Sequence, residues 1–325
     1  MKLAYSWLVG VAVAALVAGP AMAQQKVLRF GHLHSVDSPV HKGITKAAEE
    51  VEKQTQGRYK INIFPSSQLG QAREMVQQVV DGNLDFISEG PGSLSALHRP
   101  LSVFEAPFIA RDYDHLLKML ESDYAKEQLR VMETQRNMAY IGTFYYGVRH
   151  FTTKGKALQT AADVKGLKIR VPEAPLFLAM IRALEATPTP MSLGEVYLSL
   201  QTGVADGQEN PLPTINNNKF FEVQKFLNLT GHVIVPVMIM MNNKVYAAAT
   251  PADQAAFKTA FLAGAKVNDD LTRADEASLV DAFKAKGMTV VNSDRESFRA
   301  RMTSVYELGE KDWGAGTYQK LQAIK

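Results

Sequence analysis

The stretch VLRFGHLHSVDSPVHKGITKAAEEVEKQTQGRYKINIFPSSQLGQAREMVQQVVDGNLDFIS, residues 27–88, sets the fold class. Short apolar runs alternate in it with longer runs whose apolar residues recur at helical spacing. The predicted elements are a strand at Val27–Gly31, a helix at Ser38–Gln54, a strand at Tyr59–Phe64, a helix at Glu74–Asp81 and a strand at Leu84–Ser88. Strands that alternate with helices are typical of an α/β domain with parallel strand pairing.

The same alternation begins again in the middle of the chain. Here the sequence predicts a strand at Leu167–Val171, helices at Pro175–Ala186 and Gly194–Gly203, and a strand at Val233–Met241. Pro236 interrupts the last strand and requires an edge position or a bulge, because proline has no N–H to donate. No Pro/Gly/Ser-rich linker separates the two α/β regions. We therefore expect two lobes that are joined by several chain crossings and move about a hinge.

Residues 250–287 predict one long helix. A continuous helix of this length spans roughly 50 Å, enough to cross between two lobes. A break near Gly264 or Asn268 is the plainer alternative, since a long helix is more than a single domain needs. Further along, Ser293 and Glu296 have the spacing of a capping box and predict the start of a last helix.

The composition indicates a globular protein of about two domains. The chain has 325 residues, of which 46% are hydrophobic and 21% charged, and its formal net charge is +3. These values exclude a disordered chain or a very small domain, and the balanced charge argues against a nucleic-acid partner. The absence of cysteine excludes disulfides, thiol nucleophiles, zinc–thiolate sites and lipid attachment through an N-terminal cysteine.

Residues 1–23 have the three parts of a secretory signal peptide. Lys2 precedes the apolar run Trp7–Ala18, and small residues follow at the end. A membrane anchor is the alternative, but the apolar run is shorter than the roughly 20 residues that cross a bilayer. We therefore expect cleavage after Ala23 and a soluble, exported protein, which in a Gram-negative bacterium is periplasmic.

Sequence motifs of common enzyme classes are missing from the chain after residue 23. It contains no G-x-S-x-G, H-E-x-x-H, phosphate-loop or dinucleotide-binding pattern, which lowers the expectation of catalysis. His32, His34, His41 and Asp37 form the alternative, a metal site built from nitrogen and oxygen ligands. A strand followed by a helix start is expected to keep His41 apart from the other two histidines. We therefore expect no metal and no cofactor.

Three residues suit the binding of an organic anion. Arg170 lies near the end of a predicted strand, where open α/β sheets present residues to a crevice, and its guanidinium matches a carboxylate. Arg149 offers a second cationic contact, and the amide of Asn210 can both donate and accept hydrogen bonds. The alternatives are a structural ion pair for Arg170, stacking on a tyrosine for Arg149, and a turn cap for Asn210.

Six segments around these residues carry a family likeness. They are FPSSQLG (64–70), DGNLDF (81–86), RHFTT (149–153), GLKIRVP (166–172), TPTPMSLGEVYLSLQTGVADGQENP (187–211) and FFEVQKFLNLTGH (220–232). In order and spacing they resemble the DctP-type family, the periplasmic solute-binding proteins of TRAP transporters, above all its sialic-acid-binding branch and sugar-acid-binding relatives. The resemblance implies an α/β, two-lobed periplasmic-binding-protein fold, with hinge strands and a long lobe-spanning helix, that closes over an organic acid.

The resemblance also implies lobe boundaries and residue roles. One lobe comprises residues 24–146 plus 236–275, and the other residues 147–235 plus 276–325. Arg170 corresponds to the arginine that clamps the ligand carboxylate in the family. Arg149 corresponds to the family's second arginine and Asn210 to its ligand-contacting asparagine.

The chain departs from the sialate-binding branch at several positions. Leu33 stands where that branch has an asparagine, Ala72 and Gly90 where it has acidic residues, and Glu173 where it has an asparagine. Contacts to a nine-carbon sugar are therefore missing, and sialate is not the expected ligand. His34, Glu89 and Glu173 are expected to read ligand hydroxyls, which favours a uronate or an aldonate.

The expected function is that of a monomeric periplasmic receptor that delivers one small organic acid to the TRAP membrane permease without chemical change. A C4-dicarboxylate, a short hydroxy acid and an aromatic acid are the alternatives within this class. From other classes, a secreted metal-dependent sugar-acid hydrolase or lyase and a structural or adhesive envelope protein remain open.

Overall fold

The computed structural model describes residues 25–325, and the predicted signal peptide lies outside them. Within that range nine strands form one mixed sheet in the order β2-β1-β3-β8-β4-β7-β5-β6, with β9 beside β8. The strands are β1 Lys26–Gly31, β2 Tyr59–Phe64, β3 Phe86–Glu89, β4 Met138–Thr153, β5 Lys168–Val171, β6 Thr187–Pro190, β7 Gly207–Pro211, β8 Phe226–Asn242 and β9 Thr289–Val291.

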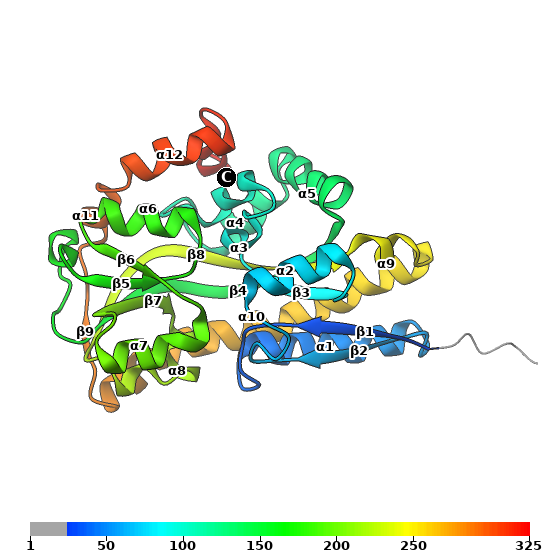
Figure 1. Ribbon diagram of the computed structural model, residues 1–325, viewed down its shortest axis with the longest axis horizontal. Coiled ribbons are helices and arrows are strands. Elements are labelled where there is room, and N and C mark those ends of the chain that lie inside the picture. Colours follow the sequence, from blue (N-terminus) through cyan, green and yellow to red (C-terminus); the bar gives the residue numbers. More distant parts are fainter. Residues whose placement is uncertain (1–24) are drawn as a thin grey trace, which may run out of the picture.

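Helices cover the sheet on both faces (Figure 1). The α-helices are α1 Pro39–Gln54, α2 Ala72–Asp81, α3 Pro91–Leu94, α4 Tyr113–Leu120, α5 Asp123–Arg136, α6 Pro175–Ala183, α7 Val196–Thr202, α8 Leu212–Asn217, α9 Asn243–Ala247, α10 Pro251–Ala285, α11 Arg295–Arg299, α12 Thr303–Trp313 and α13 Thr317–Gln322. Short 3-10 helices are η1 Arg99–Glu105, η2 Ala161–Val164, η3 Leu193–Glu195 and η4 Phe220–Glu222. None of the helices in residues 25–325 is both long and apolar enough to cross a membrane.

Two long antiparallel strands, β4 and β8, connect two halves of the sheet. The parallel strands β1, β2 and β3 join β8 through residues 238–241, at one end of the β4–β8 pair. The parallel strands β5, β6 and β7 join β4 through residues 149–153, at the other end. Figure 1 shows these two groups of strands on opposite sides of the molecule. The predicted parallel pairing and two-part organisation are confirmed.

Helix α10 is continuous over 35 residues, so the alternative of a break is wrong. Gly264 lies against α1, where a Cβ would come within 2.4 Å of the carbonyl oxygen of Gly43, and Asn268 donates to the carbonyl oxygen of Tyr145. Both residues thus serve close packing of an unbroken helix. The helix contacts α1 in one half, α8 and β9 in the other, and the connecting strand β4, so it spans both halves.

Pro236 lies in the middle of the sheet rather than at its edge. Strand β8 pairs with β3 on one side and β4 on the other, so the edge alternative is wrong. The bulge alternative is confirmed: the register shifts between Tyr145 and Gly147 of β4, opposite Pro236 and Val235 of β8. Gly147 has φ +117°, a conformation that glycine adopts without strain.

Helix ends followed the sequence signals in part. Ser38 caps α1, accepting from the backbone N–H of His41, and Pro39 opens the helix as predicted. The helix predicted to run to Ala186 ends at Ala183. The capping box at Ser293 is wrong: Asp294 caps α11, two further helices follow, and Ser293 donates to the carbonyl oxygen of Leu158 instead.

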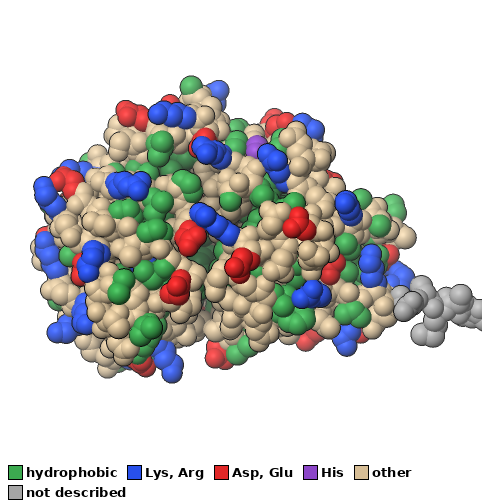
Figure 2. Space-filling view, viewed as in Figure 1, with side chains coloured by type: hydrophobic (Ala, Val, Ile, Leu, Met, Phe, Trp, Pro, Cys, Tyr) green, Lys and Arg blue, Asp and Glu red, His purple; other side chains and the backbone are tan. Residues whose placement is uncertain are grey.

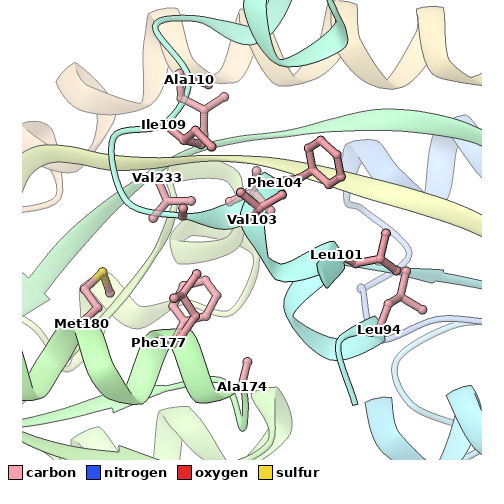
Figure 3. Close-up of a cluster of buried hydrophobic side chains, with 14 of the residues drawn as sticks. Leu94, Leu101, Val103, Phe104, Ile109, Ala110, Ala174, Phe177, Met180 and Val233 are labelled. Atoms are coloured by element: carbon pink, nitrogen blue, oxygen red, sulfur yellow. The ribbon is translucent and has the colours of Figure 1, made fainter. Parts of the chain in front are cut away.

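The largest hydrophobic core joins the two halves on one face of the sheet. Side chains of η1 and the segment after it, among them Val103 and Phe104, pack towards Val233 of β8 and towards Phe177 and Met180 of α6 (Figure 3). This packing fixes the position of Glu105, the last residue of η1.

Candidate functional site

A cavity of about 560 Å³ lies between the two halves. Its lining comes from α2 and the end of β3 on one side, and from the β5–α6 connection, β7 and η3 on the other. Figure 2 shows the groove between the halves, with both acidic and basic side chains at its rim. The volume falls within the roughly 300–1,000 Å³ that small-molecule sites occupy. All six predicted site residues line this cavity: His34, Glu89, Arg149, Arg170, Glu173 and Asn210.

Arg170 is a buried cation without a carboxylate partner among the described residues. Its side chain extends from the carboxyl end of β5 and is 3% exposed. Nε and one terminal nitrogen donate to the carbonyl oxygen of Met191, at 3.2 and 2.7 Å, and no described carboxylate lies within 4 Å. Burial lowers the pKa of Arg170 to about 10. The structural ion pair considered as the alternative is therefore not formed in residues 25–325.

Arg149 lines the same cavity but is already paired. Its Nε and Nη2 contact the two carboxylate oxygens of Glu209 at 2.5 and 2.7 Å, and Nη2 also donates to the Glu209 carbonyl oxygen. The guanidinium stands 5.0 Å from the ring centroid of Phe177, so the stacking partner is a phenylalanine and the tyrosine alternative is wrong.

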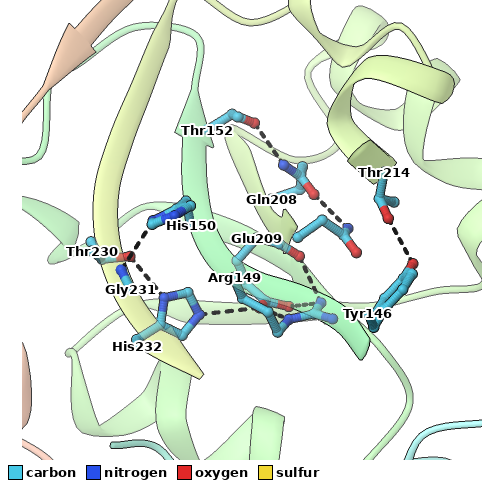
Figure 4. Close-up of polar contacts among 11 residues, drawn as sticks. Tyr146, Arg149, His150, Thr152, Gln208, Glu209, Thr214, Thr230, Gly231 and His232 are labelled. Atoms are coloured by element: carbon cyan, nitrogen blue, oxygen red, sulfur yellow. Dashed lines mark hydrogen bonds and ion pairs between the residues drawn. The ribbon is translucent and has the colours of Figure 1, made fainter. Parts of the chain in front are cut away.

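Behind Arg149 a chain of buried polar groups continues away from the cavity (Figure 4). His232 Nε2 lies 3.1 Å from Glu209 Oε2, and Thr230 Oγ1 lies 2.7 Å from His232 Nδ1. Sequence reasoning missed Glu209 and His232 as site residues, although both lie in segments that carry the family likeness. Side chains along a strand point alternately to its two faces, and the sequence alone did not show which face of this strand is turned towards the site.

Asn210 is fixed by its neighbours in β7. Its Nδ2 donates to Oε1 of Gln208 at 2.6 Å, and Gln208 Nε2 donates in turn to Thr152 Oγ1 at 2.9 Å. The side chain is 2% exposed and its other polar atom is Oδ1. Asn210 forms no turn cap: helix α8 begins at Leu212 with Pro211 at the capping position.

Two carboxyl groups form the wall on the β3 side. Glu89 ends β3 and is 4% exposed, and its Oε1 has no hydrogen-bond partner among the described residues. Glu105, which the sequence analysis did not single out, accepts from the backbone N–H of Gly92 at 2.5 Å. Burial raises the pKa of Glu89 to about 8 and that of Glu105 to about 7. Both groups thus hold a proton far more readily than an ordinary carboxyl.

Gly90, between β3 and α3, and Gly92, in α3, make room for the carboxyl group of Glu105. A Cβ on Gly90 or on Gly92 would come within 2.6 Å of a carboxylate oxygen of Glu105. Gly90 therefore leaves space that the Glu105 carboxyl group occupies.

The histidine cluster is closer together than predicted. His32 Nε2 lies 3.0 Å from His41 Nδ1, because the first turn of α1 packs back over the end of β1, so the expected separation of His41 is wrong. His32 Nδ1 accepts the backbone N–H of His34, which places the proton of neutral His32 on Nε2. In residues 25–325 no group of His, Asp and Glu side chains is arranged to hold a metal ion. Burial lowers the pKa of His34, which lines the cavity, to about 4.

Glu173 lies at the mouth of the cavity, where it meets Arg73 of α2. Arg73 Nε stands 3.5 Å from the Glu173 carboxylate, and Arg73 Nη2 donates to the Glu173 carbonyl oxygen at 2.9 Å. The Glu173 side chain is 48% exposed. This pair joins the two halves across the cavity mouth.

Comparison with known proteins identifies the family. Residues 30–312 match the family described as bacterial extracellular solute-binding protein, family 7 (DctP). The chain is 34% identical over 314 residues to the sialic acid-binding periplasmic protein SiaP of Vibrio cholerae, covering 97% of this chain and 98% of that protein.

Two solved structures of TRAP periplasmic solute-binding proteins are also similar. One, from Polaromonas sp. JS666 with bound D-erythronate, has a TM-score of 0.88 and 34% identity, covering 93% of this chain and 99% of that one. The other, from Roseobacter denitrificans with bound β-D-glucuronate, has a TM-score of 0.89 and 30% identity, covering 92% and 100%.

Proposed function

Because the chain belongs to the DctP family of bacterial extracellular solute-binding proteins, the periplasmic receptors of TRAP transporters, we propose that it binds a sugar acid, a uronate or an aldonate, through Arg170. Family membership confirms the predicted receptor class and the periplasmic-binding-protein fold. Members of this family bind solutes rather than transform them, which excludes the secreted hydrolase or lyase.

The observation that carries the proposal is that the buried guanidinium of Arg170 has no carboxylate partner among the described residues. A guanidinium that is buried, faces a cavity and has no carboxylate partner among the described residues is a strong site for an incoming carboxylate. Arg149 differs, since Glu209 already balances its charge. Arg170 thus receives the carboxylate, and Arg149 and Asn210 complete the contacts to its oxygens.

The other lining groups favour a ligand with several hydroxyls. Glu89 directs an unpartnered oxygen into the site, and neutral His34 can donate and accept. The ligands bound in two solved relatives, D-erythronate and β-D-glucuronate, each contain a carboxylate and several hydroxyl groups. A C4-dicarboxylate needs a second cation, and the remaining guanidinium of the lining, Arg73, is engaged by Glu173.

Closure of the two lobes over the acid is part of the proposal. The lobe boundaries at 146/147 and 235/236 fall on the bulge where the β4–β8 register shifts between Tyr145 and Gly147. A bulge interrupts the ladder and allows the strands to bend there. The closed receptor then delivers its acid to the TRAP permease after export and cleavage behind Ala23. Small-angle scattering should report compaction when the acid is added.

A thermal-shift screen followed by calorimetry tests the proposal. The purified mature protein is screened against D-glucuronate, D-galacturonate, L-galactonate, D-erythronate, N-acetylneuraminate and succinate. At a hundredfold excess over its Kd a ligand adds roughly 2.7 kcal/mol of apparent stability, so a uronate or aldonate should raise Tm clearly. Stabilisation by succinate alone, or by none of the sugar acids, would contradict the proposal.

A further inference from the structure

We propose that binding of the acid anion in this cavity is coupled to proton uptake, and that Glu89 and Glu105 are both protonated while the ligand is bound. The inference rests on the proposed function and goes beyond it, because it makes the receptor's affinity depend on pH in a range where the ligand itself does not titrate.

The balance of buried charges around the cavity favours protonated carboxyl groups when an anion binds. Two buried cations, Arg149 and Arg170, and two buried carboxyl groups, Glu89 and Glu105, line the cavity, and a third buried carboxyl group, Glu209, lies directly behind Arg149. With all three carboxyl groups ionised the cavity would carry a net negative charge and would repel a carboxylate. With Glu89 and Glu105 protonated the net charge is positive and suits a single carboxylate.

The geometry assigns the protons to Glu89 and Glu105 rather than to Glu209. Glu209 is held by two nitrogens of Arg149 and by His232, which stabilises its ionised form. Neither Glu89 nor Glu105 has a described cation within 4 Å, and both lie at the same turn, where Glu105 contacts Gly90 and Gly92 directly after Glu89. An unpaired buried carboxyl group is stable mainly in its neutral form.

Groups from every neighbouring element face this pair. They are His34 after β1, Tyr146 and Arg149 of β4, Arg170 of β5, Glu209 of β7, and, at the exposed rim, Arg73 and Glu74 of α2, Glu173 and Glu195. The rim charges are screened by solvent. His34 titrates well below neutral pH, since burial lowers its pKa to about 4, so it is uncharged where Glu89 and Glu105 titrate.

The sign of the linkage follows from these positions. In the empty protein the pKa of Glu89 is about 8 and that of Glu105 about 7. A bound carboxylate is a further negative charge in the same cavity and raises both pKa values, so binding takes up protons. Affinity therefore falls as the pH rises through and above this range. A sugar acid is fully ionised throughout, because its own carboxyl titrates near pH ~3.5.

Calorimetry with D-galacturonate, and in parallel with D-erythronate, tests the inference. Titrations at about pH 6 and about pH 9, each in two buffers with different heats of ionisation, give both the Kd and the number of protons taken up. We expect little proton uptake at about pH 6, where both groups are already protonated in the empty protein, a clear net uptake at about pH 9, and a Kd that rises at least about tenfold between the two pH values.

Variants locate the proton. Glu89→Gln and Glu105→Gln mimic the neutral carboxyl, and each should reduce the ratio of the two Kd values and the proton uptake, whatever its effect on affinity at one pH. Glu49→Gln, an exposed position on α1, serves as the matched control and should keep both. The wild-type proton count requires no variant, so the inference remains testable if a variant does not fold.

The outcomes separate this inference from the proposed function. Binding of either acid with the same Kd at both pH values and no proton uptake would overturn the inference and leave the function standing. A pH dependence that persists in the Glu89→Gln/Glu105→Gln double variant would also overturn it. Binding of neither acid at about pH 6, together with failure of every sugar acid in the thermal-shift screen, would overturn both.

Discussion

Arg149 and Arg170 line the same cavity, yet among the described residues only Arg149 has a carboxylate partner, Glu209 at 2.5 Å. Both residues are 3% exposed. We therefore propose separate roles: Arg170 receives the ligand carboxylate, and Arg149, whose charge Glu209 already balances, holds the site together and completes the contacts to the carboxylate.

Substitution of Arg170 should abolish most of the binding. Charge-assisted hydrogen bonds contribute about 1.5–3 kcal/mol each, so Arg170→Ala, which removes two, should raise the Kd for a bound sugar acid at least about a hundredfold. Arg170→Lys retains the charge but not the fork, and should recover only part of the affinity. Calorimetry measures both. Arg182→Ala, at an exposed position on α6, is the control and should bind as the wild type does.

In the empty protein the order of effects should be reversed: substitution of Arg149 should reduce the free energy of unfolding more than substitution of Arg170. Arg149→Ala leaves the buried Glu209 carboxylate with only His232 as a side-chain partner, which should lower the free energy of unfolding by about 3–5 kcal/mol. Arg170→Ala removes a buried, unpaired charge and should leave that free energy unchanged or raise it. Denaturant unfolding without ligand measures both, and a larger loss for Arg170→Ala would contradict the assigned roles.

Sequence analysis predicted the parallel α/β halves, the start of α1 and the span of α10 because these depend on local patterns. Apolar periodicity and capping residues act within a few positions of each other. The unbroken course of α10 could not be read from Gly264 and Asn268, because their effect depends on α1 and β4, which approach from distant parts of the chain. Pro236 likewise permitted two arrangements until its partner strands were known.

In the candidate site, the sequence could identify residues whose type alone suits anion binding, but not contacts that depend on how distant segments pack together. Arg170, Arg149 and Asn210 were singled out by residue type and by family likeness, and their roles in ligand binding stay predictions. Glu105 was missed because nothing in its own sequence neighbourhood places it above the β3–α3 turn. The contact of His32 with His41 was missed because it depends on how the first turn of α1 packs over β1.

Glu173 should influence which acids the cavity accepts. Glu173→Gln removes a negative charge from the mouth of the cavity and weakens the contact with Arg73. We expect lower affinity for a uronate or aldonate and a relative gain for succinate, both measured by calorimetry. Glu307→Gln, exposed on α12, is the control. Unchanged affinities for both ligand types would leave Glu173 as a surface residue.

The free energy of unfolding should depend on pH through Glu89. Its pKa is raised from an ordinary value near 4.5 to about 8, so the folded state holds the proton more tightly than the unfolded chain. The resulting stability is fully present below pH 4.5 and is lost as the pH rises to about 8, at about 1.4 kcal/mol per unit of pKa shift.

The Glu89→Gln variant isolates this effect. It cannot ionise, so it should gain stability relative to the wild type as the pH rises across that range. Denaturant unfolding at several pH values measures the difference, and parallel curves for the two proteins would show that Glu89 titrates normally.

The central claim, that Arg170 receives the carboxylate of a sugar acid between the two halves, is tested most directly by a crystal structure of the protein with such an acid bound. We predict a carboxylate within hydrogen-bond distance of the Arg170 guanidinium, with ligand hydroxyls directed towards Glu89 and His34. A carboxylate placed on Arg73 or elsewhere in the cavity, with Arg170 still bonded only to the carbonyl oxygen of Met191, would contradict the account.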